Sequence, residues 1–133
     1  IISGQSCYKD FKEDLLGDSS SREHFAEMEE FLSKEFFENE KVTLIPHEKD
    51  KTIHVQIGSE EQRDIFHLGD GLQALILPIF ACFRYRHDPS IVVIEEPELN
   101  LHPSLQRQLI QALLKDKFEN HQFFCTTHSN HLL

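Results

Sequence analysis

Residues 91–103 read IVVIEEPELNLHP and contain the features that decide the fold. The four residues 91–94 are apolar and β-branched, which is typical of a strand buried on both faces. Two carboxylates, Glu95 and Glu96, follow at once, and Pro97 then ends the strand because proline has no N–H to donate. Ligands of open α/β sheets bind at the edge where parallel strands end. We therefore expect Glu95 and Glu96 to lie at a ligand-binding edge.

A second apolar strand is predicted farther along the chain. Pro103 suits the first position of a helix, and an apolar stripe at helical spacing predicts that this helix continues to about Lys117. Residues 122–126 (QFFCT) then indicate a buried strand that leads into His128. The order strand, helix, strand predicts two parallel neighbouring strands. The imidazole of His128 would then reach the same sheet edge as the two carboxylates.

A glycine turn precedes the central stretch. Gly69, Asp70 and Gly71 are followed by apolar residues at steps of three and four, so a helix should start at about Gly71. The free N–H groups and the dipole at the start of such a helix form an anion site. Pro78 lies inside this predicted helix and should kink it.

The N-terminal part of the chain shows no recognisable site chemistry. Residues 1–20 have no sustained period and are predicted to be a loop or a truncated end. Residues 21–37 show capping-box spacing and then helical periodicity. Alternating apolar and polar residues at 42–57 flank a charged turn, which predicts an antiparallel hairpin with one face in water.

The composition restricts the classes of partner. The chain has 133 residues and a net charge of −10, which argues against a general nucleic-acid-binding surface on it. Cys7, Cys82 and Cys125 are odd in number and widely spaced, which favours free thiols in a reducing cytoplasm. No run of eighteen apolar residues is present, so no membrane association is expected. We expect a soluble cytoplasmic protein that is a piece of a longer chain.

The acidic pair and the histidine suit phosphate chemistry. A carboxylate beside bound phosphates can hold Mg²⁺, and a second one can orient or deprotonate a water. We assign Glu95 to the metal, Glu96 to the water, and His128 to a hydrogen bond with a terminal phosphate. An acidic pair after an apolar run would also suit an ordinary solvated strand end.

Together these motifs resemble the second half of the ATP-binding-cassette type of ATPase head found in RecF, Rad50 and SMC-like proteins. HLGDGLQALI resembles the signature motif, IVVIEEP the Walker B motif with its catalytic acid, ELNLHP the D-loop region, and FFCTTHSNHLL the switch histidine. The pair EEPELNLHP and TTHSNHLL is most similar to OLD-like bacterial ATPases, including those of Septu and retron defence systems. The resemblance covers about residues 65–133.

The resemblance implies an α/β fold: a partial cassette-ATPase (P-loop NTPase-like) head with parallel strands flanked by helices, plus an N-terminal helix and β-hairpin. Residues 21–133 would form the C-terminal part of the ATPase domain. Within it, residues 21–62 would supply the helix and hairpin, and residues 63–133 the signature, Walker B and switch-histidine core.

The resemblance also implies ATP and Mg²⁺ as cofactors. Glu95 resembles the Mg²⁺-associated acid, Glu96 the catalytic base and His128 the γ-phosphate sensor. Residues 69–71 (Gly69, Asp70 and Gly71) resemble signature residues that meet the nucleotide of a second ATPase protomer. The implied function is ATP binding and Mg²⁺-dependent hydrolysis that drives head dimerisation. It would be coupled to nucleic-acid processing or antiphage defence, with DNA or RNA and a nuclease or effector domain or subunit as further partners.

Three departures from the family pattern bear on these roles. Glu95 stands where aspartate is commonest, and Gly69 occupies the usual serine position of the signature. The phosphate cradle GxxxxGK[ST] occurs nowhere in the 133 residues. We therefore expect the cradle to lie upstream of Ile1, or the chain alone to bind ATP weakly and to be inactive.

Two other interpretations remain open. Cys125, His128 and His131 have C-x-x-H-x-x-H spacing, which would suit zinc, although Cys125 is predicted to point into the packing of a buried strand. Alternatively, the chain is an interaction module that dimerises or recruits a partner without hydrolysing ATP. The missing cradle and Gly69 favour that module.

Overall fold

A computed structural model describes residues 4–17, 19–47, 49, 52–59, 63–64, 70–99 and 101–130. The chain divides into two compact units, Ile1–Gly69 and Asp70–Leu133. Among the helices in the described ranges, none has both the length and the apolar character needed to cross a bilayer.

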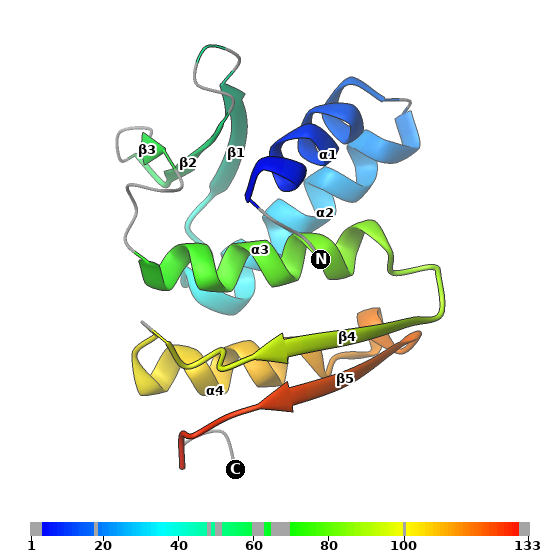
Figure 1. The fold of residues 1–133 in the computed structure, drawn as a ribbon. Coiled ribbons are helices and arrows are strands. Elements are labelled where there is room, and N and C mark those ends of the chain that lie inside the picture. Colours follow the sequence, from blue (N-terminus) through cyan, green and yellow to red (C-terminus); the bar gives the residue numbers. More distant parts are fainter. Residues whose placement is uncertain are drawn as a thin grey trace. The chain divides into compact units, whose positions relative to one another are not determined.

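The first unit combines two helices with an antiparallel sheet in the strand order β1-β2-β3 (Figure 1). Its elements are α1 (Gly4–Leu16), α2 (Ser19–Phe36), β1 (Val42–His47), β2 (Thr52–Ile57) and β3 (Arg63–Asp64). The hairpin predicted at 42–57 is confirmed, whereas the short strand β3 was not predicted.

The prediction of a loop over residues 1–20 is wrong, because residues 4–16 form α1. The ring of Phe11 is fully buried and meets the ring of Phe25 on α2 edge-on, with 4.6 Å between the ring centroids. Short helices are held mainly by tertiary packing of one face. A contact with a second helix is not visible in the local period of residues 1–20, which explains the error.

A carboxylate joins α2 to the edge strand β1. Because β1 is the outer strand of its sheet, the N–H of Leu44 needs a partner outside the β1–β2 ladder. Glu29 Oε1 accepts this hydrogen bond at 2.7 Å. Burial raises the pKa of Glu29, while the bond from Leu44 and the charge of Lys41 oppose that rise.

The second unit has an α/β fold in which helices flank a pair of parallel strands. Its elements are α3 (Asp70–Arg84), β4 (Ser90–Glu95), α4 (Pro103–Leu113), the 3₁₀-helix η2 (Asp116–Phe118) and β5 (His121–Thr126). The two strands pair from Ser90↔His121 to Glu95↔Thr126. The predicted parallel neighbours, and the fold class as a whole, are confirmed.

Helix α3 begins at Asp70, one residue before the predicted start, and continues through Pro78 to Arg84. Leu75, Ile76 and Ile79 are fully buried, as expected for an apolar stripe at helical spacing.

Helix α4 ends at Leu113, short of the predicted end at Lys117. His102 is its N-cap residue, and Pro103 occupies the first turn. The chain then forms η2, in which Phe118 is buried and makes a T-shaped contact with the Phe83 ring at 5.2 Å between centroids. Phe118 is therefore buried from the short η2 turn and not from a continuation of α4.

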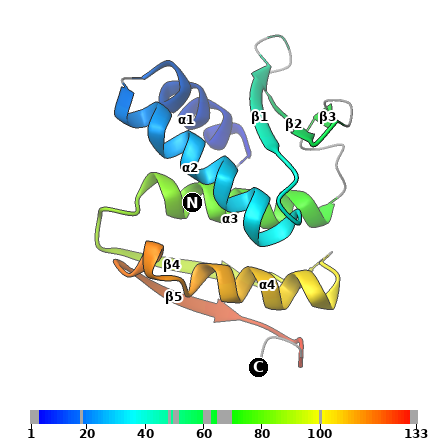
Figure 2. The same cartoon turned by 180° about the vertical axis from the view of Figure 1, so that it is seen from behind.

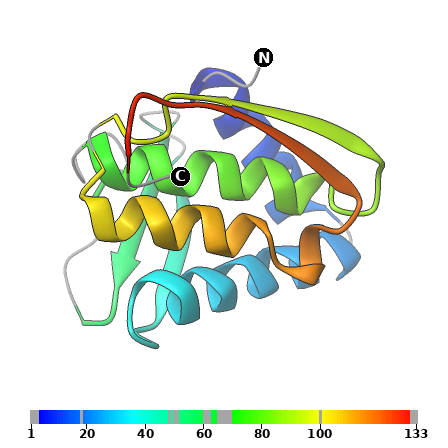
Figure 3. The same cartoon turned by 90° about the horizontal axis from the view of Figure 1, so that it is seen from below.

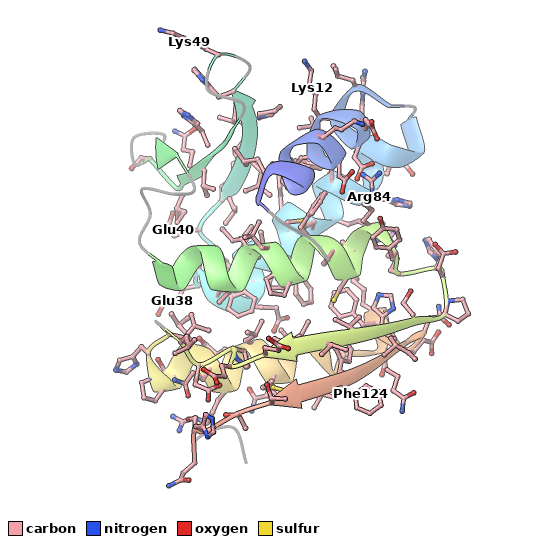
Figure 4. All side chains as sticks on the ribbon, viewed as in Figure 1. Lys12, Glu38, Glu40, Lys49, Arg84 and Phe124 are labelled. Atoms are coloured by element: carbon pink, nitrogen blue, oxygen red, sulfur yellow. The ribbon has the colours of Figure 1, made fainter. Side chains whose placement is uncertain are left out.

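The two-stranded sheet is covered on one face by α4, which lies behind the strands in Figure 1 and in front of them in Figure 2. On the other face Ile91, Val93 and Phe124 are 71%, 64% and 52% exposed. Figure 4 labels Phe124 on β5. The prediction of a strand buried on both faces is therefore wrong for the described part of the chain. Only alternate residues of the β-branched stretch 91–94 face the covering helix, because the described elements of this unit cover one face of the sheet. Cys125 is also exposed, contrary to the prediction.

Candidate functional site

The carboxyl ends of β4 and β5 lie side by side at the end of the second unit where α3 and α4 begin (Figures 1, 2 and 3). The N–H of Glu96 donates to the carbonyl of Thr126 at 2.9 Å and closes the ladder. Pro97 is buried immediately after it. Polar residues that follow both strands are thereby brought to one edge, as the sequence predicted.

Glu96 has a φ of 44°, in the left-handed region that L-residues rarely adopt. The strand ends at Glu95, so this conformation turns the chain at the first residue after β4. Left-handed backbone costs an L-residue about 1–2 kcal/mol. Such strained residues cluster at functional sites, which makes Glu96 the leading candidate here.

We expect the Glu96→Gly variant to be more stable than Glu96→Ala by about 1 kcal/mol, because glycine adopts positive φ without a Cβ clash. Both variants lose the carboxylate. The difference between their free energies of unfolding, measured by urea denaturation, therefore reports the cost of the left-handed backbone at position 96. Equal stabilities would contradict the left-handed conformation.

Glu96 faces His128, which follows the neighbouring strand. Glu96 Oε1 and His128 Nε2 are 3.6 Å apart. This distance allows a charge contact when the imidazole is protonated but is too long for a hydrogen bond. The Glu96 side chain is 40% exposed and that of His128 is 89% exposed, so both groups are open to a ligand.

Glu98 links the segment after β4 to the segment after β5. Its Oε1 accepts hydrogen bonds from Thr127 Oγ1 at 2.8 Å, the His128 N–H at 2.6 Å and the Ser129 N–H at 3.1 Å. Oε2 is buried and has no hydrogen-bond partner among the described residues. Burial pushes the pKa of Glu98 upward, but its own N–H and these three donors outweigh burial and lower the pKa overall.

Gln106 on α4 joins the same network and is buried at 6% exposure. Its Nε2 donates to the carbonyls of Leu101 at 2.9 Å and Glu98 at 3.4 Å. Its Oε1 accepts from Ser129 Oγ at 2.9 Å. The helix therefore holds both segments of the edge.

The other predicted site residues are placed as follows. Asp70 and Gly71 are the first two residues of α3, whereas Gly69 lies outside the described residues. Glu95 is exposed and follows Ile91 and Val93 along the exposed face of β4. Glu96 and His128 are brought together, with the start of α3 at the same end of the unit.

Sequence reasoning assigned no role to Glu98 or Gln106. Glu98 meets residues about 30 positions later in the chain, and no local period reveals such a pair. The sequence held one indication of this role for Glu98: the backbone N–H groups that follow β5 need an acceptor. Glu98, a carboxylate three residues beyond the end of the parallel neighbour β4, was a candidate for it.

No group of three His, Cys, Asp or Glu side chains suited to a metal ion occurs in the described ranges. His131, one member of the proposed zinc set, lies outside them. Partial burial raises the pKa of Cys125, and the nearby charge of Glu98 raises it further. Both effects disfavour the thiolate that zinc binds.

Two solved structures share this fold at 15% sequence identity. One is described as "Structural biochemistry of ATP-driven dimerization and DNA stimulated activation of SMC ATPases", with a TM-score of 0.61 over 84% of this chain and 72% of that chain. The other is an SMC head bound to the C-winged helix domain of ScpA, with a TM-score of 0.64 over 96% of this chain. This chain spans only 41% of that second structure's length.

No curated protein matches the sequence significantly. A family model does match, over residues 8–133, and it supports an ATP-binding ATPase domain. The likeness to SMC heads comes from the two solved structures and concerns the fold. This chain belongs to the family described as "AAA domain, putative AbiEii toxin, Type IV TA system".

Proposed function

We propose that this chain supplies the hydrolytic edge of an ATPase head. The observation that carries the proposal is the approach of Glu96 and His128 to 3.6 Å, at the ends of adjacent parallel strands and open to solvent. Membership of an AAA-domain family supports ATP as the substrate.

In the proposed reaction, Glu96 holds a water molecule, which attacks the terminal phosphorus of ATP as the bond to ADP breaks. The carboxylate of Glu96 takes the proton from that water. His128 donates from its imidazole N–H to a terminal phosphate oxygen. Mg²⁺, when bound, neutralises charge on the phosphates.

The carboxylate oxygens after β4 fit magnesium, because this ion prefers carboxylate oxygens as ligands and keeps several of its bound water molecules. We assign the carboxylate of Glu95 to it, directly or through a bound water. Exposure of Glu95 at the end of β4 is compatible with this role.

A second protomer completes the proposed site. Asp70 and Gly71 open α3, whose free N–H groups can meet phosphate, and Gly69 is included in this role from the sequence. ATP-driven dimerisation is described for an SMC ATPase that shares this fold. Residues 63–133 would then act as the signature, Walker B and switch core, after the helix and hairpin at 21–62.

The phosphate cradle GxxxxGK[ST] is absent from the 133 residues, so we propose that another segment of the full-length protein supplies it. We also propose a place in the OLD-like branch, a cytoplasmic location, and coupling to nucleic-acid processing or antiphage defence through a nuclease or effector. These finer assignments rest on the motif pair EEPELNLHP and TTHSNHLL.

The proposal is tested by measuring ATP hydrolysis by the full-length protein while Mg²⁺ is titrated. We expect hydrolysis to require Mg²⁺, and Glu95→Gln to raise the Mg²⁺ concentration for half-maximal activity by about tenfold or more. The matched control is Glu119→Gln, an exposed glutamate that lies between η2 and β5. An unchanged Mg²⁺ requirement in Glu95→Gln would remove Glu95 from the metal site.

A non-hydrolysing dimerisation module is the second candidate, and the missing cradle favours it. Wild-type protein that dimerises without releasing phosphate from ATP would support that candidate over the enzyme.

A further inference from the structure

We propose that Glu98 is a positioning residue that holds the backbone of residues 127–129, so that the imidazole of His128 stays opposite Glu96. The inference rests on the proposed function of the Glu96–His128 pair.

The hydrogen bonds of Glu98 act on both sides of His128. The N–H of His128 belongs to the peptide unit before its Cα, and the N–H of Ser129 belongs to the unit after it. Both donate to the same oxygen, Glu98 Oε1, at 2.6 and 3.1 Å. Anchoring both peptide planes restricts φ and ψ of His128 and therefore the direction of its side chain.

His128 needs such an anchor because its own side chain is 89% exposed. Packing therefore restrains the imidazole very little. Small errors in the position of a catalytic group are costly, since rate depends steeply on geometry. Backbone hydrogen bonds to a fixed carboxylate are the means by which the described residues hold this histidine.

The anchor is itself fixed from two directions. Glu98 follows Glu96 by two residues, and its backbone carbonyl accepts from the buried amide of Gln106. The same amide accepts from Ser129 Oγ at 2.9 Å. Thr127 Oγ1 donates to Glu98 and accepts from the Ser129 N–H at 2.9 Å. The segments that carry Glu96 and His128 are thus tied into one network.

The charge of Glu98 strengthens this anchor at neutral pH. Although burial raises its pKa, the donors lower it below the usual range, so the group is ionised at pH 7. Hydrogen bonds to a charged acceptor are stronger than neutral ones. With a depressed folded pKa, the stabilising effect is present above the unfolded value of about 4.3 and is lost as pH falls through the folded pKa.

Hydrogen exchange measured by mass spectrometry on the full-length protein tests the anchor without using ATP. In Glu98→Ala we expect the peptide containing residues 126–130 to exchange about tenfold faster or more, because two amides lose a charged acceptor. Glu98→Gln keeps an acceptor oxygen without the charge and should lie between Glu98→Ala and wild type. It also serves as the test if Glu98→Ala does not fold. Glu119→Ala is the control and should exchange as wild type.

A double-mutant cycle on ATP hydrolysis tests the positioning role. We expect Glu98→Ala to lower kcat about tenfold with little change in KM, and Glu98→Gln to restore part of the loss. In a His128→Ala background, Glu98→Ala should have no further effect on kcat, because the residue it positions is gone.

The outcomes separate this inference from the proposed function. If His128→Ala and Glu96→Gln strongly lower kcat, but Glu98→Ala leaves exchange unchanged or lowers the residual kcat of the His128→Ala background by the same factor as in wild type, the positioning role is wrong. If His128→Ala and Glu96→Gln leave hydrolysis intact while Glu98→Ala still accelerates exchange, the proposed function fails and the backbone anchor stands.

Discussion

Replacing Glu96 by glutamine is expected to reduce kcat for ATP hydrolysis by the full-length protein about 10²–10⁴-fold. The amide cannot accept the proton of the attacking water, yet its size and its approach to His128 are preserved. ATP binding should remain, so we expect bound nucleotide and a dimer to accumulate. Phosphate release and size-exclusion chromatography with ATP measure the two effects.

The control for this prediction is Glu119→Gln. It removes an exposed carboxylate that lies away from Glu95, Glu96 and His128 in the sequence, so it should leave kcat unchanged. A Glu96→Gln protein that hydrolyses ATP at the wild-type rate would exclude Glu96 as the base. An inactive wild type that still dimerises would instead favour the non-hydrolysing module.

Leu109→Ala is expected to lower the free energy of unfolding by about 2–5 kcal/mol. Leu109 is fully buried on α4, the helix that covers one face of the parallel strands. Truncation removes apolar contacts and leaves a cavity that the surrounding helix and strands fill only partly. Urea unfolding of wild type and variant measures the difference.

Leu114→Ala is the matched control, because the same atoms are removed one residue after α4 at a side chain that is 72% exposed. It should change the free energy of unfolding by no more than about 0.5 kcal/mol. Equal losses for Leu109→Ala and Leu114→Ala would show that α4 does not pack as described.

Strong local patterns made most of the second unit predictable. The β-branched run at 91–94, the proline at 103 and the apolar stripe at 72–83 each indicate one type of element, and all three elements formed. The helix α1 was missed because the packing of Phe11 against Phe25 on another helix is not visible in the local sequence. The strand at 91–94 was predicted to be buried on both faces, but one face is exposed. Burial of a strand depends on which layers cover the sheet, and the residues of the strand alone do not reveal those layers.

The candidate site divides in the same way. Glu96 and His128 were predicted to meet because parallel strands end at one edge, and the 3.6 Å approach agrees with that reasoning. In the sequence, Glu98 was only one residue of the motif ELNLHP, and no role was predicted for it. Its three donors come from residues 127–129, which only the pairing of β4 with β5 brings within reach.

By itself, the sequence determined which residues end the two strands and which chemical groups they bring to the sheet edge, because strand and helix periods and proline positions are local properties. Only the tertiary structure decided that Glu96 takes a left-handed backbone, that one sheet face remains exposed, and that Glu98 and Gln106 hold the segment around His128. The physical reason is that these features depend on how segments distant in the sequence come together. The hydrogen bonds of Glu98 join segments about 30 residues apart, and the exposed face depends on which layers cover the sheet. No local pattern encodes that geometry.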